Sequence, residues 1–582
     1  MAKEFDLVVR GGMVADGSGA EPIEADVAIK DGLVAEVGRV HGRGTEEISA
    51  KGMLVTPGFV DIHTHYDGQI TWADRLAPSS NHGVTTVVMS NCGVGFAPCS
   101  PKDRDLLIRL MEGIEDIPAP VMAAGIPWQW ESFPQYLDFL DTRPCDMDFA
   151  TQVPHAPVRV NVMGQRAADR EPATDDDLAR MTKIVQEAVI AGALGFTTSR
   201  TMNHRTRAGA LAPTVTAAEE ELRAIALGLK SIGRGVLQFV DDFNATSSLG
   251  SAEFEMWQRV AAASGRPMSF SVFQDKKAPL RYREILEMIV KANKVGPPSS
   301  RIRGQVSARP VGNLFGLDLS SNPFSNCPTY QGIAHLPLAA RVPEMRRPEF
   351  RARLLKEEPV GVVGRETRNR NDLANMYELG EPPVYGPDPV DSIGARAAQK
   401  GITPLEYAYD LLVQGDGGTL IYYPSANFAE RTLEPLFEML THPDTVISLG
   451  DGGAHVARIC DASMPTFLLT YWTRDRKGER LPVGKTIQML CSDTADTVGL
   501  GDRGRLARGY VGDLNIIDFD RLQLHAPRPA FDLPTGAVCL SQKANGYVAT
   551  VKNGAVTYRE GKPTTALPGR LLRGARPAPP TH

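Results

Sequence analysis

The sequence predicts an α/β protein in which one large parallel barrel is inserted into a small β domain. Short strand patterns at both ends of the chain predict the β domain, and alternating strand and helix patterns between them predict the barrel. The composition agrees with a globular enzyme, because 42% of the 582 residues are hydrophobic and 23% are charged. Membrane, fibrous, disordered and disulfide-rich classes are not expected with such a composition.

Both ends of the chain contain the sequence pattern of a β-hairpin with a tight turn. Residues 25–37 read as two alternating runs around an Asp-Gly pair, and residues 547–558 repeat the pattern around an Asn-Gly pair. Such pairs favour tight hairpin turns because both residues tolerate positive φ. We therefore expect strands from both ends to form a single β domain.

The middle of the chain alternates between strand and helix patterns. Residues 84–89 form a β-branched run, residues 175–192 have helical spacing and end in a glycine, and residues 194–198 return to a strand. This alternation predicts βα units around a parallel sheet, and its length suits one barrel with long loops.

We divide the chain at the points where these patterns change. Residues 1–57 and 501–567 are assigned to the β domain and residues 58–500 to the barrel. Residues 568–582 are rich in Pro and Arg, which predicts a flexible tail.

Charge and cysteine usage bear on partners and location. The formal net charge is −6, so neither nucleic acid nor an anionic membrane is expected as a partner. We find no apolar run long enough to span a membrane and no apolar signal segment at the start. The seven cysteines lack C-x-x-C spacing, which favours a reducing compartment. These features predict a cytoplasmic enzyme.

The strongest local signal is a pair of histidines at the end of an apolar strand. His63 and His65 follow the run 57–62, and their i, i+2 spacing places both imidazoles on one face of a strand. Two neutral imidazoles on one face form a natural half of a divalent metal site.

Two further strand ends carry chemically useful groups. Cys92 follows the run 84–89 in a Gly-bounded turn, where it could bind metal, act as a nucleophile or be an inert core thiol. Asp451 follows the run 446–449 and precedes two glycines. It could bind a metal and take a proton from an attacking water, although an isolated Asp-Gly-Gly is also a common turn.

Taken together, these motifs resemble the amidohydrolase superfamily, and most closely its D-aminoacylase branch, the N-acyl-D-amino-acid deacylases. The resemblance extends over nearly the whole chain and includes "TPGFVDIHTHYDGQ", "HGVTTVVMSNCGVGFAP", "GALGFTTSR" and "GRLARGYVGDLNIIDFD". It implies a distorted TIM (β/α)8 barrel with a β-sandwich built from both terminal segments.

The resemblance also implies roles for the motif residues. His63 and His65 match the family's first-strand metal ligands, Cys92 matches its cysteine ligand, and Asp451 matches its last-strand catalytic aspartate. The implied reaction is hydrolysis by a metal-activated water, with Asp451 moving the water's proton to the leaving amine.

One departure from the family pattern concerns the metal. The family has two more histidines on middle strands, whereas the corresponding segments 234–243 and 266–275 contain none. We therefore expect a reduced site on His63, His65 and Asp451, with Cys92 or His455 as a fourth group. Such a site should hold one divalent metal per chain rather than two, and Zn²⁺ is the favoured ion.

Three residues are candidate substrate contacts. His204 lies in a loop after the strand 194–198 that should overhang the pocket. Arg309 follows the strand-like "RGQVSA" and could clamp a carboxylate or form a surface ion pair. His455 follows the glycines beside Asp451.

The predicted activity is cleavage of a C–N amide bond of a small molecule, with an N-acyl-(D-)amino acid as the best single substrate. A cyclic amide or lactam hydrolase of the same superfamily is an alternative. Loss of two ligands also allows a metal-poor binding protein without hydrolase activity, and Cys92 allows a metal-independent thiol hydrolase. The superfamily resemblance further favours a homo-oligomer.

Overall fold

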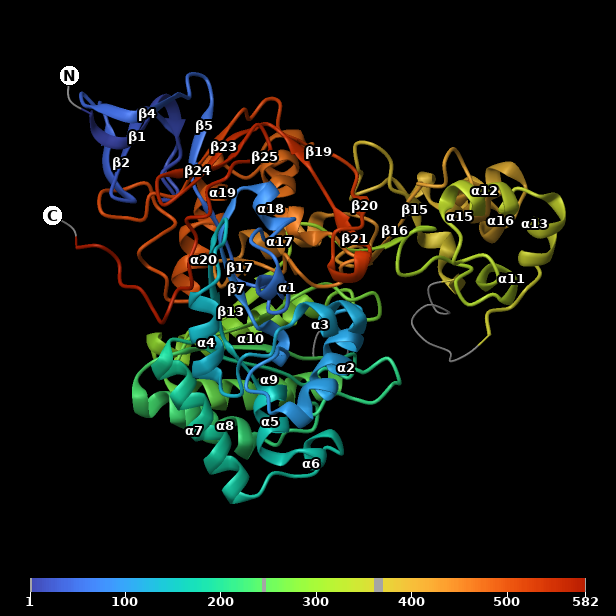
Figure 1. Ribbon diagram of the computed structural model, residues 1–582, viewed down its shortest axis with the longest axis horizontal. Coiled ribbons are helices and arrows are strands. Elements are labelled where there is room, and N and C mark those ends of the chain that lie inside the picture. Colours follow the sequence, from blue (N-terminus) through green and yellow to red (C-terminus); the bar gives the residue numbers. More distant parts are fainter. Residues whose placement is uncertain (1–2, 243–246, 361–369, 581–582) are drawn as a thin grey trace.

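A nine-stranded sheet joins the two ends of the chain (Figure 1). The computed structural model describes residues 3–242, 247–360 and 370–580. The strand order is β25-β24-β23-β18-β5-β1-β2-β3, with β4 paired to β1. The antiparallel pair β18·β5 connects the two terminal segments. The strands are β1 (Lys3–Val14), β2 (Ile23–Lys30), β3 (Leu33–Gly38), β4 (Arg43–Ser49), β5 (Leu54–Pro57), β18 (Leu514–Ile517), β23 (Tyr547–Lys552), β24 (Ala555–Arg559) and β25 (Lys562–Pro563).

The middle of the chain forms a ring of parallel strands. Three of them pair in the order β6-β7-β8 and six in the order β17-β13-β12-β11-β10-β9, while β8 and β9 are separated only by Gln152. The ring closes where His65 N–H donates to Gly452 O at 2.7 Å. This is the strand order that an α/β barrel requires. The strands are β6 (Phe59–Asp61), β7 (Val84–Met89), β8 (Asp148–Thr151), β9 (Val153–Pro154), β10 (Gly195–Ser199), β11 (Val236–Val240), β12 (Met268–Ser271), β13 (Ile302–Val306) and β17 (Thr445–Ile447).

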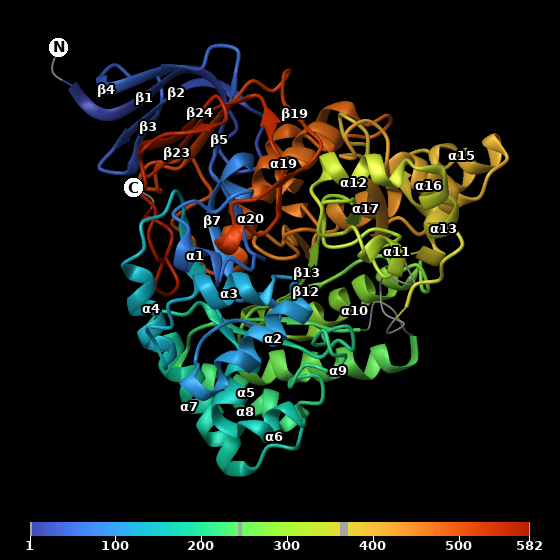
Figure 2. The ribbon, with the colours of Figure 1, turned by 45° about the vertical axis from the view of Figure 1, so that its right-hand side comes forward.

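Helices pack around this ring (Figures 1 and 2). The helix α7 (Asp175–Ala191) is typical: Thr174 and Asp177 form a capping box at its start, and Met181 and Val185 are buried on its inner face. The other helices of the ring are α1 (Gln69–Trp72), α2 (Arg104–Ile114), α3 (Ala119–Gly125), α4 (Phe133–Asp141), α5 (His155–Met163), α6 (Gln165–Ala168), α8 (Glu219–Ile232), α9 (Ser247–Ser264), α10 (Arg281–Val295), α17 (Glu434–Thr441), α18 (Met464–Phe467), α19 (Val483–Leu490) and α20 (Ser492–Thr497). Among the described residues, we find no helix with the length and apolar character needed to cross a membrane.

A separate lobe stands between β13 and β17, at the right of Figure 1. It has its own apolar core, which includes Phe324, Tyr409 and Ile421. Its elements are β14 (Val311–Phe315), α11 (Pro328–Gln331), α12 (Leu338–Met345), α13 (Pro348–Leu354), β15 (Tyr377–Glu378), α15 (Ile393–Lys400), α16 (Pro404–Leu412) and β16 (Ile421–Ala426). The strand and helix patterns used above did not predict this lobe, because they follow only local periodicity.

A two-part hairpin leaves the β domain after β18 and reaches the ring of parallel strands. In it, β19 (Gln523–Leu524) pairs with β22 (Ala544–Asn545), and β20 (Arg528–Ala530) pairs with β21 (Cys539–Ser541). Its tip packs against α3, and Leu540 N–H donates to Val456 O at 2.6 Å. The hairpin therefore supports the loop that follows β17.

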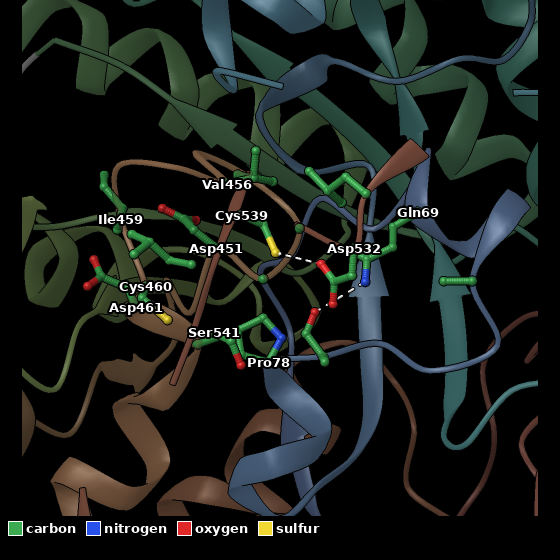
Figure 3. A pocket seen from close by; sticks show the side chains of 18 of the residues that line it. Gln69, Pro78, Asp451, Val456, Ile459, Cys460, Asp461, Asp532, Cys539 and Ser541 are labelled. Carbon is green, nitrogen blue, oxygen red and sulfur yellow. Dashed lines mark hydrogen bonds between the residues drawn. The ribbon is translucent and has the colours of Figure 1, made fainter. Parts of the chain in front are cut away.

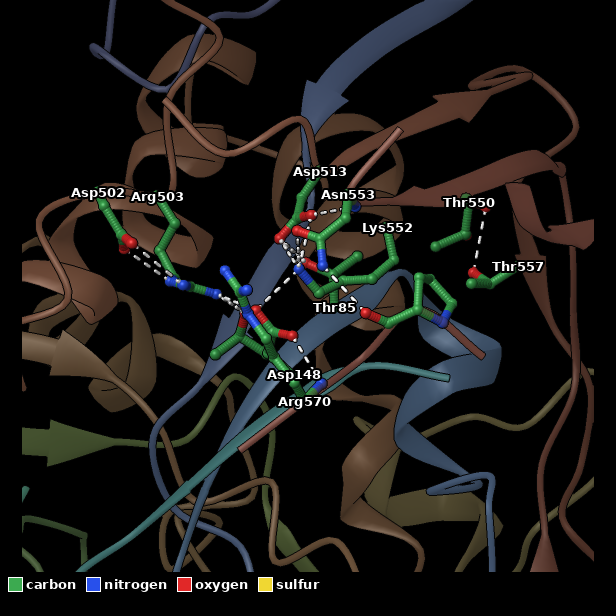
Figure 4. A network of polar contacts seen from close by, with 12 residues as sticks. Thr85, Asp148, Asp502, Arg503, Asp513, Thr550, Lys552, Asn553, Thr557 and Arg570 are labelled. Carbon is green, nitrogen blue, oxygen red and sulfur yellow. Dashed lines mark hydrogen bonds and ion pairs between the residues drawn. The ribbon is translucent and has the colours of Figure 1, made fainter. Parts of the chain in front are cut away.

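A buried ionic network joins the β domain to the ring of parallel strands (Figure 4). Lys552 Nζ on β23 lies 2.8 Å from Asp148 Oδ2 on β8 and 2.9 Å from Asp513 Oδ1. Arg503 Nη1 lies 2.8 Å from the same Asp148 oxygen. All four side chains are nearly inaccessible, so the network is an internal junction.

The last described segment differs from the flexible tail that its composition predicts. Gly569 N–H donates to Cys145 O at 2.9 Å, and Leu572 N–H donates to Phe149 O at 2.8 Å. Further along, Gly574 N–H donates to Gly192 O at 2.7 Å. Leu571 and Leu572 are also buried. Backbone pairing and these two leucines hold the segment against the ring, which a count of Pro and Arg does not reveal.

Candidate active site

His63, His65 and Cys92 converge at the ends of the first two ring strands. Their ligand atoms all lie within 4.8 Å of one another, and all three residues are buried. The distance between His63 Nε2 and Cys92 Sγ is 3.3 Å. The i, i+2 pair after β6 and the turn after β7 thus place three metal-ligand groups at one point, and no other such group occurs among the described residues.

Asp451 reaches the same point from the last ring strand. Its Oδ1 lies 3.5 Å from His63 Nε2. Burial raises the pKa of Asp451 to about 7. A carboxylate with such a pKa can both take and return a proton near neutral pH.

The turn that carries Cys92 has an unusual backbone. Ser90 and Cys92 have φ values of 63° and 58°. Gln238 Oε1 on β11 accepts the Cys92 N–H at 3.1 Å, and Thr197 Oγ1 on β10 accepts the Gly93 N–H at 3.2 Å. Side chains from β10 and β11 therefore hold the turn in place.

The electrostatics keep the Cys92 thiol neutral. Burial raises its pKa well above the usual value, and the carboxylates of Glu115 and Asp451 add to the effect. A nucleophilic thiolate would need the opposite environment. A bound cation can deprotonate such a thiol, which favours a ligand role over a nucleophilic one.

His63 is held in a defined orientation. Its Nδ1 lies 2.7 Å from Gln305 Oε1 on β13. Burial lowers the pKa of His63 to about 4, although the Gln305 hydrogen bond raises it. The imidazole is therefore neutral, as a metal ligand must be.

The two middle strands carry no histidine, as the sequence indicates, and their inward groups have other partners. Gln238 on β11 holds the Cys92 backbone. On β12, Ser269 Oγ accepts from Gln305 Nε2 at 2.9 Å. These side chains support the residues at the site instead of adding imidazole ligands.

Glu115 is a site residue that the sequence did not reveal. Its Oε1 lies 3.6 Å from His65 Nδ1 and its Oε2 lies 3.7 Å from His455 Nε2, and its side chain is only 3% exposed. The segment "MEGIEDIP" reads as an ordinary charged helix end, so no local pattern marked it. The predicted contact His455 is thus placed beside the histidine pair, across a buried carboxylate.

The other two predicted substrate contacts have different settings. His204 lies in the loop after β10, near the histidine pair. Burial is the main cause that lowers the pKa of His65, and the charges of His63, His455 and His204 lower it further, in that order. Arg309 is buried, and its Nη2 donates to Cys460 O at 2.6 Å and to Asp461 Oδ1 at 3.1 Å. The guanidinium also stacks on Tyr385, so Arg309 belongs to an internal ion pair rather than to a surface one.

A cavity of about 330 Å³ flanks the loop after β17 (Figure 3). The hairpin lines one side through Asp532, Cys539 and Ser541, and α1 and the loop after β17 line the others. In Figure 3 the Asp451 carboxylate points away from Asp532 and Gln69. Asp451 itself lines this cavity, whereas His63 and His65 are not among its lining residues.

Comparison with known proteins places this architecture in a family. The sequence profile of the amidohydrolase family matches residues 46–558, and the chain belongs to that family. It is similar to N-acyl-D-glutamate deacylase of Alcaligenes xylosoxydans xylosoxydans, with 24% identity over 575 residues, which cover 98% of this chain and 97% of that protein. D-aminoacylase of the same organism is 32% identical over 200 residues, which cover 34% of this chain and 38% of that one.

Two solved structures share the fold. One is N-acyl-D-glutamate deacylase from Bordetella bronchiseptica, complexed with zinc and a phosphonate inhibitor that mimics the tetrahedral intermediate (TM-score 0.65, 19% identity, 98% of this chain and 100% of that one). The other is D-aminoacylase (TM-score 0.64, 21% identity, 98% of this chain and 100% of that one).

Proposed function

We propose that this protein is a metal-dependent hydrolase that cleaves a C–N amide bond of a small molecule, with an N-acyl-D-amino acid as the substrate class. The observation that carries the proposal is the convergence of His63, His65 and Cys92, with Asp451 3.5 Å from His63. Similarity to N-acyl-D-glutamate deacylase over 98% of the chain supports the substrate class. We propose a distorted TIM barrel as the scaffold, in keeping with the closed order of the parallel strands.

The residues present fit a transition metal. Two imidazoles and a thiol within 4.8 Å form a donor set that zinc prefers. His65 Nδ1 is buried and has no hydrogen-bond partner among the described residues, as expected of an atom that serves a metal site. His63, His65, Cys92 and Asp451 would hold the ion. When bound, the metal would polarise the amide carbonyl and lower the pKa of water.

The protein would transfer the proton of the attacking water through the side chain of Asp451. Asp451 would accept a proton from the attacking water and pass it to the leaving amine, because its Oδ1 lies 3.5 Å from His63 Nε2, beside the proposed metal ligands. Gly452 follows Asp451 at a close approach, because a Cβ there would lie 2.6 Å from both Ser79 Oγ and Tyr66 Oη.

We propose one metal per chain. D-aminoacylase is described as having a binuclear metal center. Here the middle strands provide Gln238 and Ser269, and both are engaged in hydrogen bonds that support Cys92 and Gln305. This arrangement leaves one group of donors among the described residues, which suits one ion.

The test combines metal content with turnover. We expect about one metal per chain by elemental mass spectrometry and release of free amine from N-acetyl-D-amino acids but not from their L forms. His63→Ala should lose the metal, whereas Asp451→Asn should stay folded and lose turnover. His41→Ala, at an exposed position, serves as the control. A parent protein without metal, or a folded Asp451→Asn variant with near-normal turnover, would contradict the proposal.

A further inference from the structure

The two histidines of the site differ in how their rings are held. His63 Nδ1 has a close partner, Gln305 Oε1, at 2.7 Å. His65 Nδ1 faces Glu115 Oε1 at 3.6 Å, beyond hydrogen-bond distance. Of these two histidines, His63 has its ring fixed by a direct contact with a side chain on β13, whereas His65 has no such contact within hydrogen-bond distance among the described residues.

Gln305 is itself held on both sides of its amide. It lies on β13 and is 1% exposed. Its Nε2 donates to Ser269 Oγ on β12 at 2.9 Å, and its Oε1 faces His63 Nδ1 at 2.7 Å. An amide oxygen only accepts hydrogen bonds, and the proton of His63 must therefore lie on Nδ1.

This tautomer leaves the lone pair on Nε2, the nitrogen that faces Cys92 Sγ at 3.3 Å and Asp451 Oδ1 at 3.5 Å. A buried amide costs free energy unless its donors and acceptors are paired, and an apolar side chain could fill the same space. Gln305 instead places its amide between Ser269 and His63. The resulting chain of hydrogen bonds runs from Ser269 through Gln305 to His63, which belongs to the proposed metal-ligand group.

We propose that Gln305 is a positioning residue that keeps His63 in the tautomer presenting Nε2 to the metal. The inference rests on the proposed metal site but not on the identity of the substrate. Partners of this kind fix both the orientation and the tautomer of ligand imidazoles, and their loss typically lowers metal affinity by about 10–100-fold.

The experiment compares metal affinity in three variants. Gln305→Met keeps the length of the side chain and removes its hydrogen bonds, whereas Gln305→Glu keeps an acceptor for His63 Nδ1–H. Gln542→Met is the matched control, since Gln542 is also fully buried but donates to Tyr385 Oη and His525 O, away from the histidine pair. Zinc and cobalt(II) affinities are measured by competition with a chromophoric chelator, and the cobalt absorption spectrum reports the ligand geometry.

We expect Gln305→Met to bind both metals about 10–100-fold more weakly and to change the cobalt spectrum. Gln305→Glu should restore the parent affinity or exceed it, and Gln542→Met should match the parent. Parent-like affinity in Gln305→Met, or an equal loss in Gln305→Glu or in the Gln542 control, would overturn the inference.

These outcomes are separable from those of the proposed function. If the parent binds metal and hydrolyses no N-acyl-D-amino acid, a weakened Gln305→Met variant still supports the inference while the substrate class fails. If the parent hydrolyses the substrate and Gln305→Met binds metal normally, the inference fails alone. A parent that binds neither metal overturns both.

Discussion

Three residues of the candidate site have backbones in the left-handed region. Cys92 has a φ of 58°, Asp451 of 46° and His455 of 49°. Non-glycine residues adopt this region at a cost of about 1–3 kcal/mol, so the surrounding structure must hold them there. Gln238 is one such restraint, because it accepts the N–H of Cys92.

We predict that Gln238→Met will lower the free energy of unfolding by about 1–3 kcal/mol, since it leaves a buried N–H without its acceptor. The Cys92 turn should loosen, and zinc affinity should fall with it. Urea denaturation and chelator competition measure the two effects. Unchanged stability together with unchanged affinity would show that the turn does not depend on Gln238.

At the scale of elements, the most predictable parts were those governed by local chemistry. The Asp-Gly and Asn-Gly turns form as expected, with positive φ at Asp31 and Asn553. The run 84–89 is a strand, and the helix expected from 175 ends at Ala191, next to Gly192. Local propensity and turn chemistry decide such elements without distant contacts.

The parts that could not be predicted depend on contacts between distant segments. The lobe between β13 and β17, the hairpin from Gln523 to Asn545 and the paired segment after Gly569 are examples. At the site, the strand-end motifs indicated His63 and Asp451. Glu115 could not be predicted in this way, because only the folded chain places the end of α2 beside His65. The sequence around Glu115 has the same local pattern as that around a carboxylate on a surface helix, so the two cannot be told apart from the sequence.

The hairpin from Gln523 to Asn545 contacts the loop that follows Asp451 through Leu540. Leu540 is 4% exposed and its N–H donates to Val456 O, in the loop that follows Asp451. Leu540→Ala should lower the free energy of unfolding by about 2–5 kcal/mol through the lost packing. It should also reduce turnover, because the loop that carries Asp451 loses support.

Chemical denaturation and turnover of an N-acetyl-D-amino acid test this expectation. Phe531→Ala is the control, because Phe531 lies in the same hairpin and is 61% exposed. An equal effect of both variants would show that the hairpin does not act through its buried contact.

For the molecule as a whole, we predict that stability depends on the ionic network of Figure 4 that joins the β domain to the ring of parallel strands. Lys552→Met removes the cation between Asp148 and Asp513. Breaking one partner of a buried network typically costs about 3–5 kcal/mol, because the remaining charge is uncompensated. Arg559→Met, which breaks the exposed pair with Glu46, should cost about 0–1 kcal/mol. Similar losses in the two variants would contradict the role of the junction.

The same junction predicts a response to acid. Burial raises the pKa of Asp148, but Lys552 and Arg503 outweigh burial and hold that pKa below its usual value. Its contribution to stability is therefore full above the unfolded pKa of about 3.9 and is lost as the pH falls through the folded pKa. In Lys552→Met the folded pKa should rise, so acid unfolding should begin at a higher pH. Circular dichroism during an acid titration measures this onset, and an unchanged onset would contradict the prediction.

The closure of the ring at His65 and Gly452 has a consequence for biosynthesis. The segments that close the ring also carry His63 and Asp451, which lie far apart in the sequence. A growing chain on the ribosome therefore exposes the two histidines of the proposed metal site long before the aspartate is made. The nine-stranded sheet can form only later still, because β5 pairs with β18, which is synthesised after Asp451. The site becomes complete only late in translation, when the segment after β17 emerges and pairs with the segment after β6.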